Sequence, residues 1–203
     1  AGNTGTATAT FHVDLPPSPV PALDVVVRGD GVVLAWDPSV DPGVTGYRVT
    51  RDGVELGTVP GNALDLPPVT GPSTTLDVRP IDAQGLVGPP RAVVVPRLDF
   101  VLADYGTHDV DGASFLTHHL FDGLLLQVTN HDSATHATGP LSVELLDYEA
   151  NVRHARDVRA SLVLPAAGAL PVDVVVPVHP DLVGPDNVVR ASFVLAGVPG
   201  TSV

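Results

Sequence analysis

Carboxylate side chains gather most densely between positions 104 and 112 of this 203-residue chain. Asp104, Asp109 and Asp111 precede Gly112 in this stretch. Calcium takes about six to eight oxygen ligands, and an Asp-x-Asp loop with nearby carbonyl groups supplies several of them. The complete spacing of a calcium-binding loop is missing. The three aspartates are therefore the candidate ligands of a calcium ion, and the competing interpretation is a solvated acidic loop.

Histidines concentrate in the second half of the chain, at positions His108, His118, His119, His131, His136, His154 and His179. Zinc requires ligands in a tetrahedral arrangement at defined spacings. His118 and His119 are adjacent, so a strand would direct their side chains to opposite faces. We interpret these histidines as scattered loop residues rather than as a zinc site.

The sequence offers no pattern typical of an enzyme. It contains no Gly-x-Ser-x-Gly motif and no cysteine, which excludes a serine elbow, cysteine nucleophiles and disulfides. Arg28-Gly29-Asp30 spells an integrin-recognition tripeptide, but Gly-Asp-Gly is also what a short turn contains. The turn is the preferred interpretation, and we predict a non-catalytic protein.

The chain is strongly acidic, with a formal net charge of -13, and arginine alone carries its positive charge. Such a surface repels phosphate backbones and anionic lipids, so nucleic-acid partners and membrane binding are disfavoured. No apolar run approaches the length of a membrane-spanning helix, and no signal peptide is present. Because the first residue is Ala1, the chain is processed, a fragment or renumbered. We expect a secreted or cell-surface protein.

Short valine-rich runs separated by 20 glycines and 21 prolines predict an all-β protein. We expect strands at 23–27, 32–36, 46–51, 54–59, 74–79 and 91–95, with Asp52-Gly53 as a hairpin turn. Val32, Leu34 and Trp36 share one strand face, and Tyr47 and Val49 are predicted to point inward. The segment 148–164 lacks a sustained 3.6-residue apolar stripe and is expected to form loop and strand rather than helix.

These residues resemble a fibronectin type III domain between about 20 and 97. Trp36 takes the place of that family's core tryptophan, and Gly46-Tyr47-Arg48-Val49 resembles its third strand. The family usually has a tyrosine entering the sixth strand, where this chain has Leu76. The resemblance implies a β-sandwich at residues 21–97 that serves as a spacer or binding module.

A second set of alternating segments predicts another β-sandwich over 98–203, with strands at 123–129, 141–145, 172–178 and 189–195. The run LLLQVTNHDSATHATGPLSVELLD resembles the strand, polar turn and strand of immunoglobulin-like modules in secreted bacterial proteins. The expected fold is therefore all-β, with two tandem β-sandwich domains.

The first fourteen residues form a predicted strand without a neighbour to pair with. Ala7, Ala9, Phe11 and Val13 alternate with polar residues, and a proline-rich linker at 15–20 prevents a tight hairpin. The segment 1–14 resembles the last strand of an immunoglobulin-like module. Two hypotheses remain: the chain was cut from a longer tandem array, or the strand is donated to an open sheet edge of a neighbouring subunit.

The sequence thus predicts a structural or adhesion protein, either a spacer or the repeating subunit of a surface filament, with neighbouring modules or identical subunits as partners. The alternatives are a carbohydrate-binding or spacer accessory of a secreted polysaccharide-degrading enzyme, and a virion tail or decoration protein. Aromatic residues make up only 4% of the chain, which weakens a carbohydrate-binding role. Tyr105 and Tyr148 are its candidate contacts.

Overall fold

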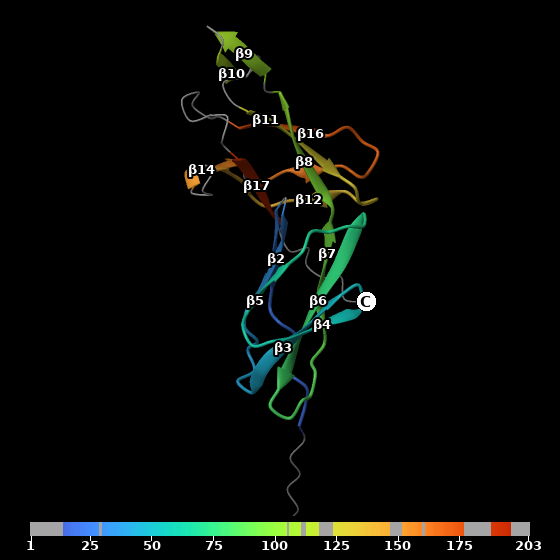
Figure 1. The fold of residues 1–203 in the computed structure, drawn as a ribbon. Coiled ribbons are helices and arrows are strands. Elements are labelled where there is room, and N and C mark those ends of the chain that lie inside the picture. Colours follow the sequence, from blue (N-terminus) through green and yellow to red (C-terminus); the bar gives the residue numbers. More distant parts are fainter. Residues whose placement is uncertain are drawn as a thin grey trace, which may run out of the picture.

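The computed structural model describes residues 14–28, 30–104, 106–110, 113–117, 124–146, 152–159, 161–176 and 188–195. For the described residues within 102–117, 145–159 and 188–195, and for residues 124 and 176, the structure describes the backbone but not the side chains. All of these residues lie in strands, turns or irregular segments, so the all-β prediction is confirmed for the described chain (Figure 1). No helix in these ranges is long and apolar enough to cross a membrane.

The N-terminal module contains seven strands in two antiparallel sheets. One sheet carries β1, β2 and β5 in that order, and the other has the order β4-β3-β6-β7. The strands are β1 (Leu23–Arg28), β2 (Gly31–Trp36), β3 (Val44–Arg51), β4 (Val54–Val59), β5 (Ala63–Leu66), β6 (Ser73–Asp82) and β7 (Arg91–Pro96). The six predicted strands are all present, and β5 is additional. Pro67 and Pro68 end β5 after four residues, too few to show a clear alternating pattern.

Trp36 and Tyr47 connect the two sheets of this module. Trp36 lies on β2 and is 4% exposed, and Tyr47 on β3 is 5% exposed. Their rings meet edge to face with centroids 5.4 Å apart. The Tyr47 hydroxyl also accepts a hydrogen bond from the Ser39 backbone N–H at 2.9 Å. The predicted inward positions are confirmed, and Leu76 on β6 is buried in the same core.

The β3–β4 hairpin turns at the predicted Asp52-Gly53 pair. Both residues have positive φ, 50° and 78°, which matches a tight hairpin turn. The Asp52 carboxylate accepts hydrogen bonds from the Thr74 hydroxyl at 2.6 Å and the Thr75 backbone N–H at 2.7 Å. These bonds, the Thr74 bond foremost, lower the pKa of Asp52. The turn is therefore anchored to β6 as well as closed on itself.

The C-terminal module begins directly after β7, with only Arg97 between the two modules. Its three-stranded sheet has the order β16-β11-β8, and β12 pairs with β15. A separate β9–β10 hairpin extends from β8. The strands are β8 (Leu98–Asp104), β9 (Gly106–Val110), β10 (Ala113–Thr117), β11 (Leu124–Asn130), β12 (His136–Ala137), β13 (Leu141–Leu146), β14 (Val152–Arg159), β15 (Val163–Leu164), β16 (Val172–Val176) and β17 (Val188–Leu195).

One six-stranded sheet contains strands from both modules, in the order β14-β13-β17-β1-β2-β5. Strand β17 pairs with β13 from Val188 to Phe193, and its last four residues pair with β1. The register with β1 runs from Arg28↔Ser192 to Val25↔Leu195. Buried apolar side chains of both modules also form one continuous cluster, which includes Leu98 at the junction. The alternation of apolar and polar residues in the sequence does not predict this shared sheet.

The proline-rich segment 15–20 lies against the N-terminal module. Pro17 and Val20 are buried, and the Ser18 backbone N–H donates to the Asp41 carboxylate. A Cβ placed on Gly88 would meet the Pro17 carbonyl oxygen at 2.2 Å, so the backbone approaches closely where glycine has no side chain. The segment is therefore a docked arm. The predicted strand at 6–14, including Ala7, Ala9, Phe11 and Val13, lies outside the described residues except for Asp14.

Replacing Gly88 with alanine is expected to displace the docked arm and destabilise the protein by about 1–3 kcal/mol, because the new methyl group overlaps backbone atoms of Pro17. Urea denaturation measures the change. The matched control is Gly43→Ala, since nothing lies within 4 Å of a Cβ at that position. Equal effects of the two substitutions would contradict the close packing of the arm.

Candidate functional site

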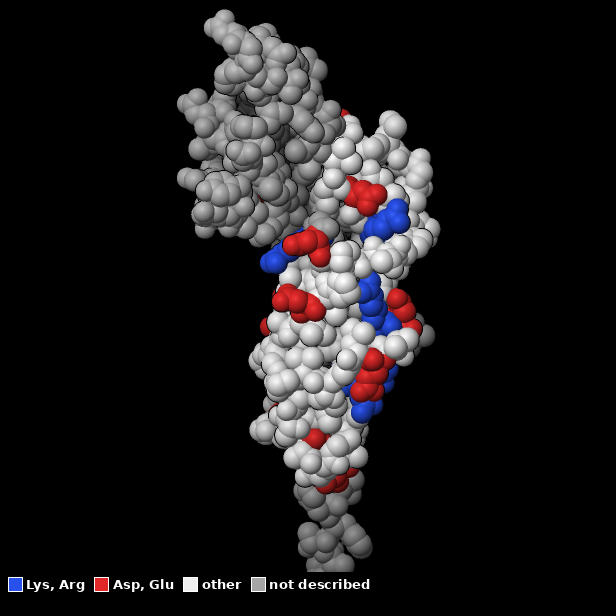
Figure 2. Space-filling view, viewed as in Figure 1, with Lys and Arg blue, Asp and Glu red and all other residues white. Residues whose placement is uncertain are grey.

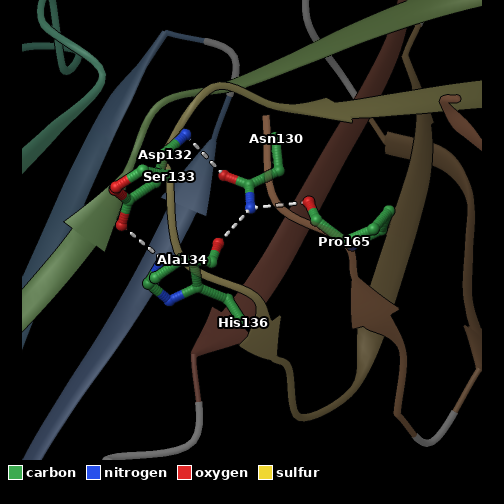
Figure 3. A network of polar contacts seen from close by, with 6 residues as sticks. All are labelled: Asn130, Asp132, Ser133, Ala134, His136 and Pro165. Carbon is green, nitrogen blue, oxygen red and sulfur yellow. Dashed lines mark hydrogen bonds and ion pairs between the residues drawn. The ribbon is translucent and has the colours of Figure 1, made fainter. Parts of the chain in front are cut away.

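The densest buried polar network in the described chain lies in the turn between β11 and β13 (Figure 3). Asn130 ends β11 and is 5% exposed. Its side-chain amide donates to the carbonyl oxygens of Ala134 and Pro165, both at 2.9 Å, and its Oδ1 accepts the Asp132 backbone N–H at 2.9 Å. Asn130 thus replaces backbone pairing for a turn that has no ladder of its own.

Asp132 and His136 form a buried hydrogen-bonded pair beside Asn130. Asp132 Oδ2 lies 2.6 Å from His136 Nε2, and only about a tenth of each side chain is exposed. Burial by itself would raise the pKa of Asp132. The hydrogen bond and charge of His136, with backbone donors of Ala134 and Ser133, outweigh burial and leave the pKa of Asp132 below its ordinary value.

The network joins the turn to the segment that follows β15. The Ala167 backbone N–H donates to the Asp132 carbonyl oxygen at 2.7 Å. Further along, the Thr138 N–H donates to Leu162 O at 2.8 Å, and the Leu162 N–H donates to Thr138 Oγ1 at 3.1 Å. These hydrogen bonds hold the irregular segments around Asp132 and Thr138 against those around Leu162 and Ala167, so they stabilise the fold.

A histidine–carboxylate pair also occurs in catalytic sites, where the histidine activates a neighbouring nucleophile such as a serine hydroxyl. Ser133 Oγ lies 3.5 Å from Asp132 Oδ1, and the only imidazole contact of the network is the one with Asp132. A serine activated by histidine needs its hydroxyl within hydrogen-bond reach of the imidazole. The geometry of the described residues therefore favours a hydrogen-bonded pair that stabilises the turn.

A second histidine–aspartate pair lies at the junction of the two modules. His131 Nε2 lies 2.6 Å from Asp99 Oδ2, and Arg97 Nε lies 3.8 Å from Asp99 Oδ1. The His131 backbone N–H donates to Arg97 O, and the Arg97 N–H donates to Pro72 O. The single connecting residue is thus held by both modules.

The predicted calcium ligands are only partly placed. Asp104 ends β8 and Asp109 lies in β9, with the description limited to their backbone, and Asp111 lies outside the described residues. The described residues contain no group of three or more histidine, cysteine, aspartate or glutamate side chains able to hold a metal ion. The calcium site stays a prediction.

Asp30 lies in a short turn, as predicted, and Arg28 and Gly31 face each other on either side of it in the β1–β2 register. Of the histidines, His118, His119 and His179 lie outside the described residues, as do Tyr105 and Tyr148. The His131 and His136 partners went unnoticed in the sequence. The spacing Asp132-x-x-x-His136 is a signal for the second of these pairs, and Asp99 lies too far from His131 in the sequence to give one.

Acidic and basic side chains are interleaved on the described surface in view (Figure 2). On the four-stranded sheet Arg48 Nε lies 3.4 Å from Glu55, and Arg79 Nε lies 3.1 Å from Asp77. This sheet face therefore presents local ion pairs, each of small energetic weight.

No protein-family model and no curated protein sequence matches the chain. Among the solved structures that are similar, two share 18% identity with this chain. The spore cortex lytic enzyme SleM of Clostridium perfringens has a TM-score of 0.39 over 41% of this chain and 29% of that one. The chitinase ChiA74 of Bacillus thuringiensis has a TM-score of 0.34 over 90% of this chain and 27% of that one. The chain thus spans less than a third of either length.

Replacing Asn130 with alanine is expected to destabilise the protein by about 3 kcal/mol, because two carbonyl groups and one N–H lose their buried partner. Urea denaturation at neutral pH measures this loss. Asn62→Ala is the control, since the Asn62 side chain is exposed. A loss no greater than that of the control would show that the network contributes nothing to stability.

Replacing Asp132 with asparagine is expected to cost about 1–3 kcal/mol at pH 7. Because the pKa of Asp132 is lowered on folding, its carboxylate stabilises the fold above about pH 4, and this stabilisation is lost as the pH falls through the lower folded value. The difference between variant and parent should therefore shrink toward pH 3.

Denaturation series at pH 7, 5 and 3 test this, with Asp65→Asn on the exposed side of β5 as the control for charge removal. A difference between the Asp132 variant and its parent that stays constant over the three pH values would contradict a charge-dependent role of the Asp132–His136 pair.

Proposed function

We propose that this chain is a non-catalytic structural part of a secreted or surface-exposed protein, acting as a stiff spacer or as a repeating subunit. The single observation that carries the proposal is the sheet β14-β13-β17-β1-β2-β5, which passes from one module into the other. Two modules joined only by a flexible linker would move independently. Here, backbone hydrogen bonds between β1 and β17 oppose that motion.

The junction supports the same role. One residue, Arg97, separates β7 from β8, and its backbone is hydrogen bonded to Pro72 in one module and His131 in the other. The apolar core continues across the junction without interruption. A short connection, a shared core and a shared sheet together favour a stiff body that transmits force and keeps its two ends at a fixed separation.

The order of the N-terminal sheets also supports the fibronectin type III interpretation. Three strands, β1-β2-β5, oppose four strands, β4-β3-β6-β7, with Trp36 and Tyr47 between them. A spacer role in an accessory region of a polysaccharide-degrading enzyme uses the same stiffness. Retention on insoluble chitin or cellulose, lost after Tyr105→Ala or Tyr148→Ala, would favour that setting over a filament.

The substitution pair Val194→Pro and Leu195→Pro tests the shared sheet. These two residues pair with β1 and lie beyond the β13 register, so proline removes donors from the β1–β17 pairing while the β13 pairing keeps its own. We expect the parent to unfold in one transition and the variant in two, with a broader size distribution in small-angle scattering.

Val194→Thr with Leu195→Thr is the matched control, because threonine keeps both backbone donors and favours strands. It should behave as the parent does. If the proline variant unfolds in one transition with unchanged scattering, the shared sheet does not couple the modules and the stiff-spacer proposal fails.

A further inference from the structure

The segment 163–172 is unusual for a surface segment because none of its side chains is polar or charged. It leads from β15 into β16 through residues 165–171, which we call the apolar loop. Residues 167–171 are all exposed. Leu170 is 86% exposed, the largest exposed fraction among the large hydrophobic side chains of the described chain. Exposed apolar patches on folded proteins mark sites where another molecule binds.

The polar network of the β11–β13 turn holds the start of the apolar loop. Asn130 Nδ2 donates to the Pro165 carbonyl oxygen at 2.9 Å (Figure 3). The Ala167 N–H donates to the Asp132 carbonyl oxygen at 2.7 Å. Asn130 and Asp132 are themselves buried, at 5% and 7% exposure. The loop is therefore fixed to the body of the C-terminal module.

A turn fixes the middle of the apolar loop. The Ala169 N–H donates to Ala166 O at 3.2 Å, and Gly168 has a φ of 89°, which glycine adopts without strain. Pro165 and Pro171 restrict the backbone at the two ends of the loop. A surface that is already ordered loses little conformational entropy when it binds a partner. The apolar loop is thus preorganised for a contact.

The exposed large hydrophobic side chains outside 163–172 have polar or charged residues beside them. For five of the six a charged residue lies within two positions in the sequence, and the sixth, Val94, faces Thr75 on β6. Single exposed apolar side chains of this kind are normal on a protein surface. The apolar loop differs from them because no polar side chain interrupts it. The five are Leu15, Val40, Val54, Leu56 and Val101.

We propose that the apolar loop binds the apolar loop of a second copy of this chain, in a contact with two-fold symmetry. Such a contact uses the same patch on both copies, so the patch must be complementary to itself. The loop meets this requirement because one large side chain, Leu170, follows the small residues 167–169. In the dimer, Leu170 of each copy lies on the small residues of the other. This contact goes beyond the stiff-spacer role and does not depend on the β1–β17 pairing.

Charge also favours the apolar loop as the place where two copies meet. Each copy carries a formal net charge of -13, so two copies repel each other over most of their surfaces. The segment 163–172 has no charged residue, and Asp132 and His136 in the adjoining turn are largely buried. Contact between two apolar loops therefore brings no like charges of these loops together.

The expected dimer is weak because the contact is small. Stable interfaces bury about 800 Å² per partner, and a single loop offers less. We expect a dissociation constant on the order of 0.1–1 mM. Such a contact joins copies that are already held close together, as they are when many are attached along one surface.

Sedimentation equilibrium of the full chain, from about 0.02 to about 1 mM, measures the association. Leu170→Asp should weaken the dimer at least tenfold, because it places two carboxylates in the contact. Leu15→Asp is the matched control, since it makes the same substitution at another leucine, which is 75% exposed. Leu170→Ser replaces Leu170→Asp if circular dichroism shows that the latter is misfolded. Added sodium chloride should strengthen the parent dimer, because salt screens the repulsion between two acidic copies.

Disulfide formation tests the symmetry of the contact, because the natural sequence has no cysteine to interfere. Ala169 is expected close to its own counterpart across the two-fold axis. Under oxidation by copper phenanthroline, Ala169→Cys should form covalent dimers at least fivefold faster than Ala63→Cys, which places the thiol at an exposed alanine of β5. Adding Leu170→Asp to the Ala169→Cys variant should lower its rate to that of the control.

Four outcomes would overturn the inference: a parent chain that stays monomeric at about 1 mM, a Leu170→Asp dimer as strong as the Leu15→Asp dimer, a dimer that weakens with added salt, or equal disulfide rates at positions 169 and 63. Each of these leaves the stiff-spacer proposal intact, since that proposal depends on the proline variants in β17 and not on the apolar loop.

Discussion

The four-residue pairing between β1 and β17 is the interaction on which the architecture depends. Without it, Arg97 and the buried apolar cluster would be the described links between the two modules. With it, the first strand of one module continues a sheet built from strands of the other. Antiparallel backbone hydrogen bonds tolerate little rotation, so even a short pairing restricts the angle between the bodies that it joins. The buried cluster around Leu98 then excludes water from the same boundary.

Polar side chains in turns and other irregular segments stabilise this shared sheet and the strands around it. The turn after β11 has few backbone partners, and Asn130 supplies three hydrogen bonds in their place. The Asp132–His136 pair stands beside it with both side chains largely buried. Asp52 has a comparable task at the β3–β4 hairpin, where it accepts two hydrogen bonds from β6. In each case a side chain satisfies backbone groups that strands would otherwise satisfy.

Much of the fold could be predicted because its strands alternate clearly. Val32, Leu34 and Trp36 occupy one face of β2 as expected, and Asp52-Gly53 forms the expected turn. The β1–β17 pairing could not be predicted, because the alternation of residues along a strand shows which face is buried but not which strand lies beside it. The docking of Pro17 on Gly88 could not be predicted either, because it depends on a glycine that lies 71 positions further along the chain. His131 and His136 were visible as residues, but their aspartate partners depend on how the turn closes.

The position of β1 and β17 in the sequence also sets the order in which the protein can be completed. Of the described strands, β1 is synthesised first and β17 last. Strand β1 can pair with β2 early, but its pairing with β17 must wait until all the other described strands have been synthesised. Contacts between such distant segments form slowly, because a long loop must close first. We therefore expect the joint between the modules to be the last part of the native sheet to form.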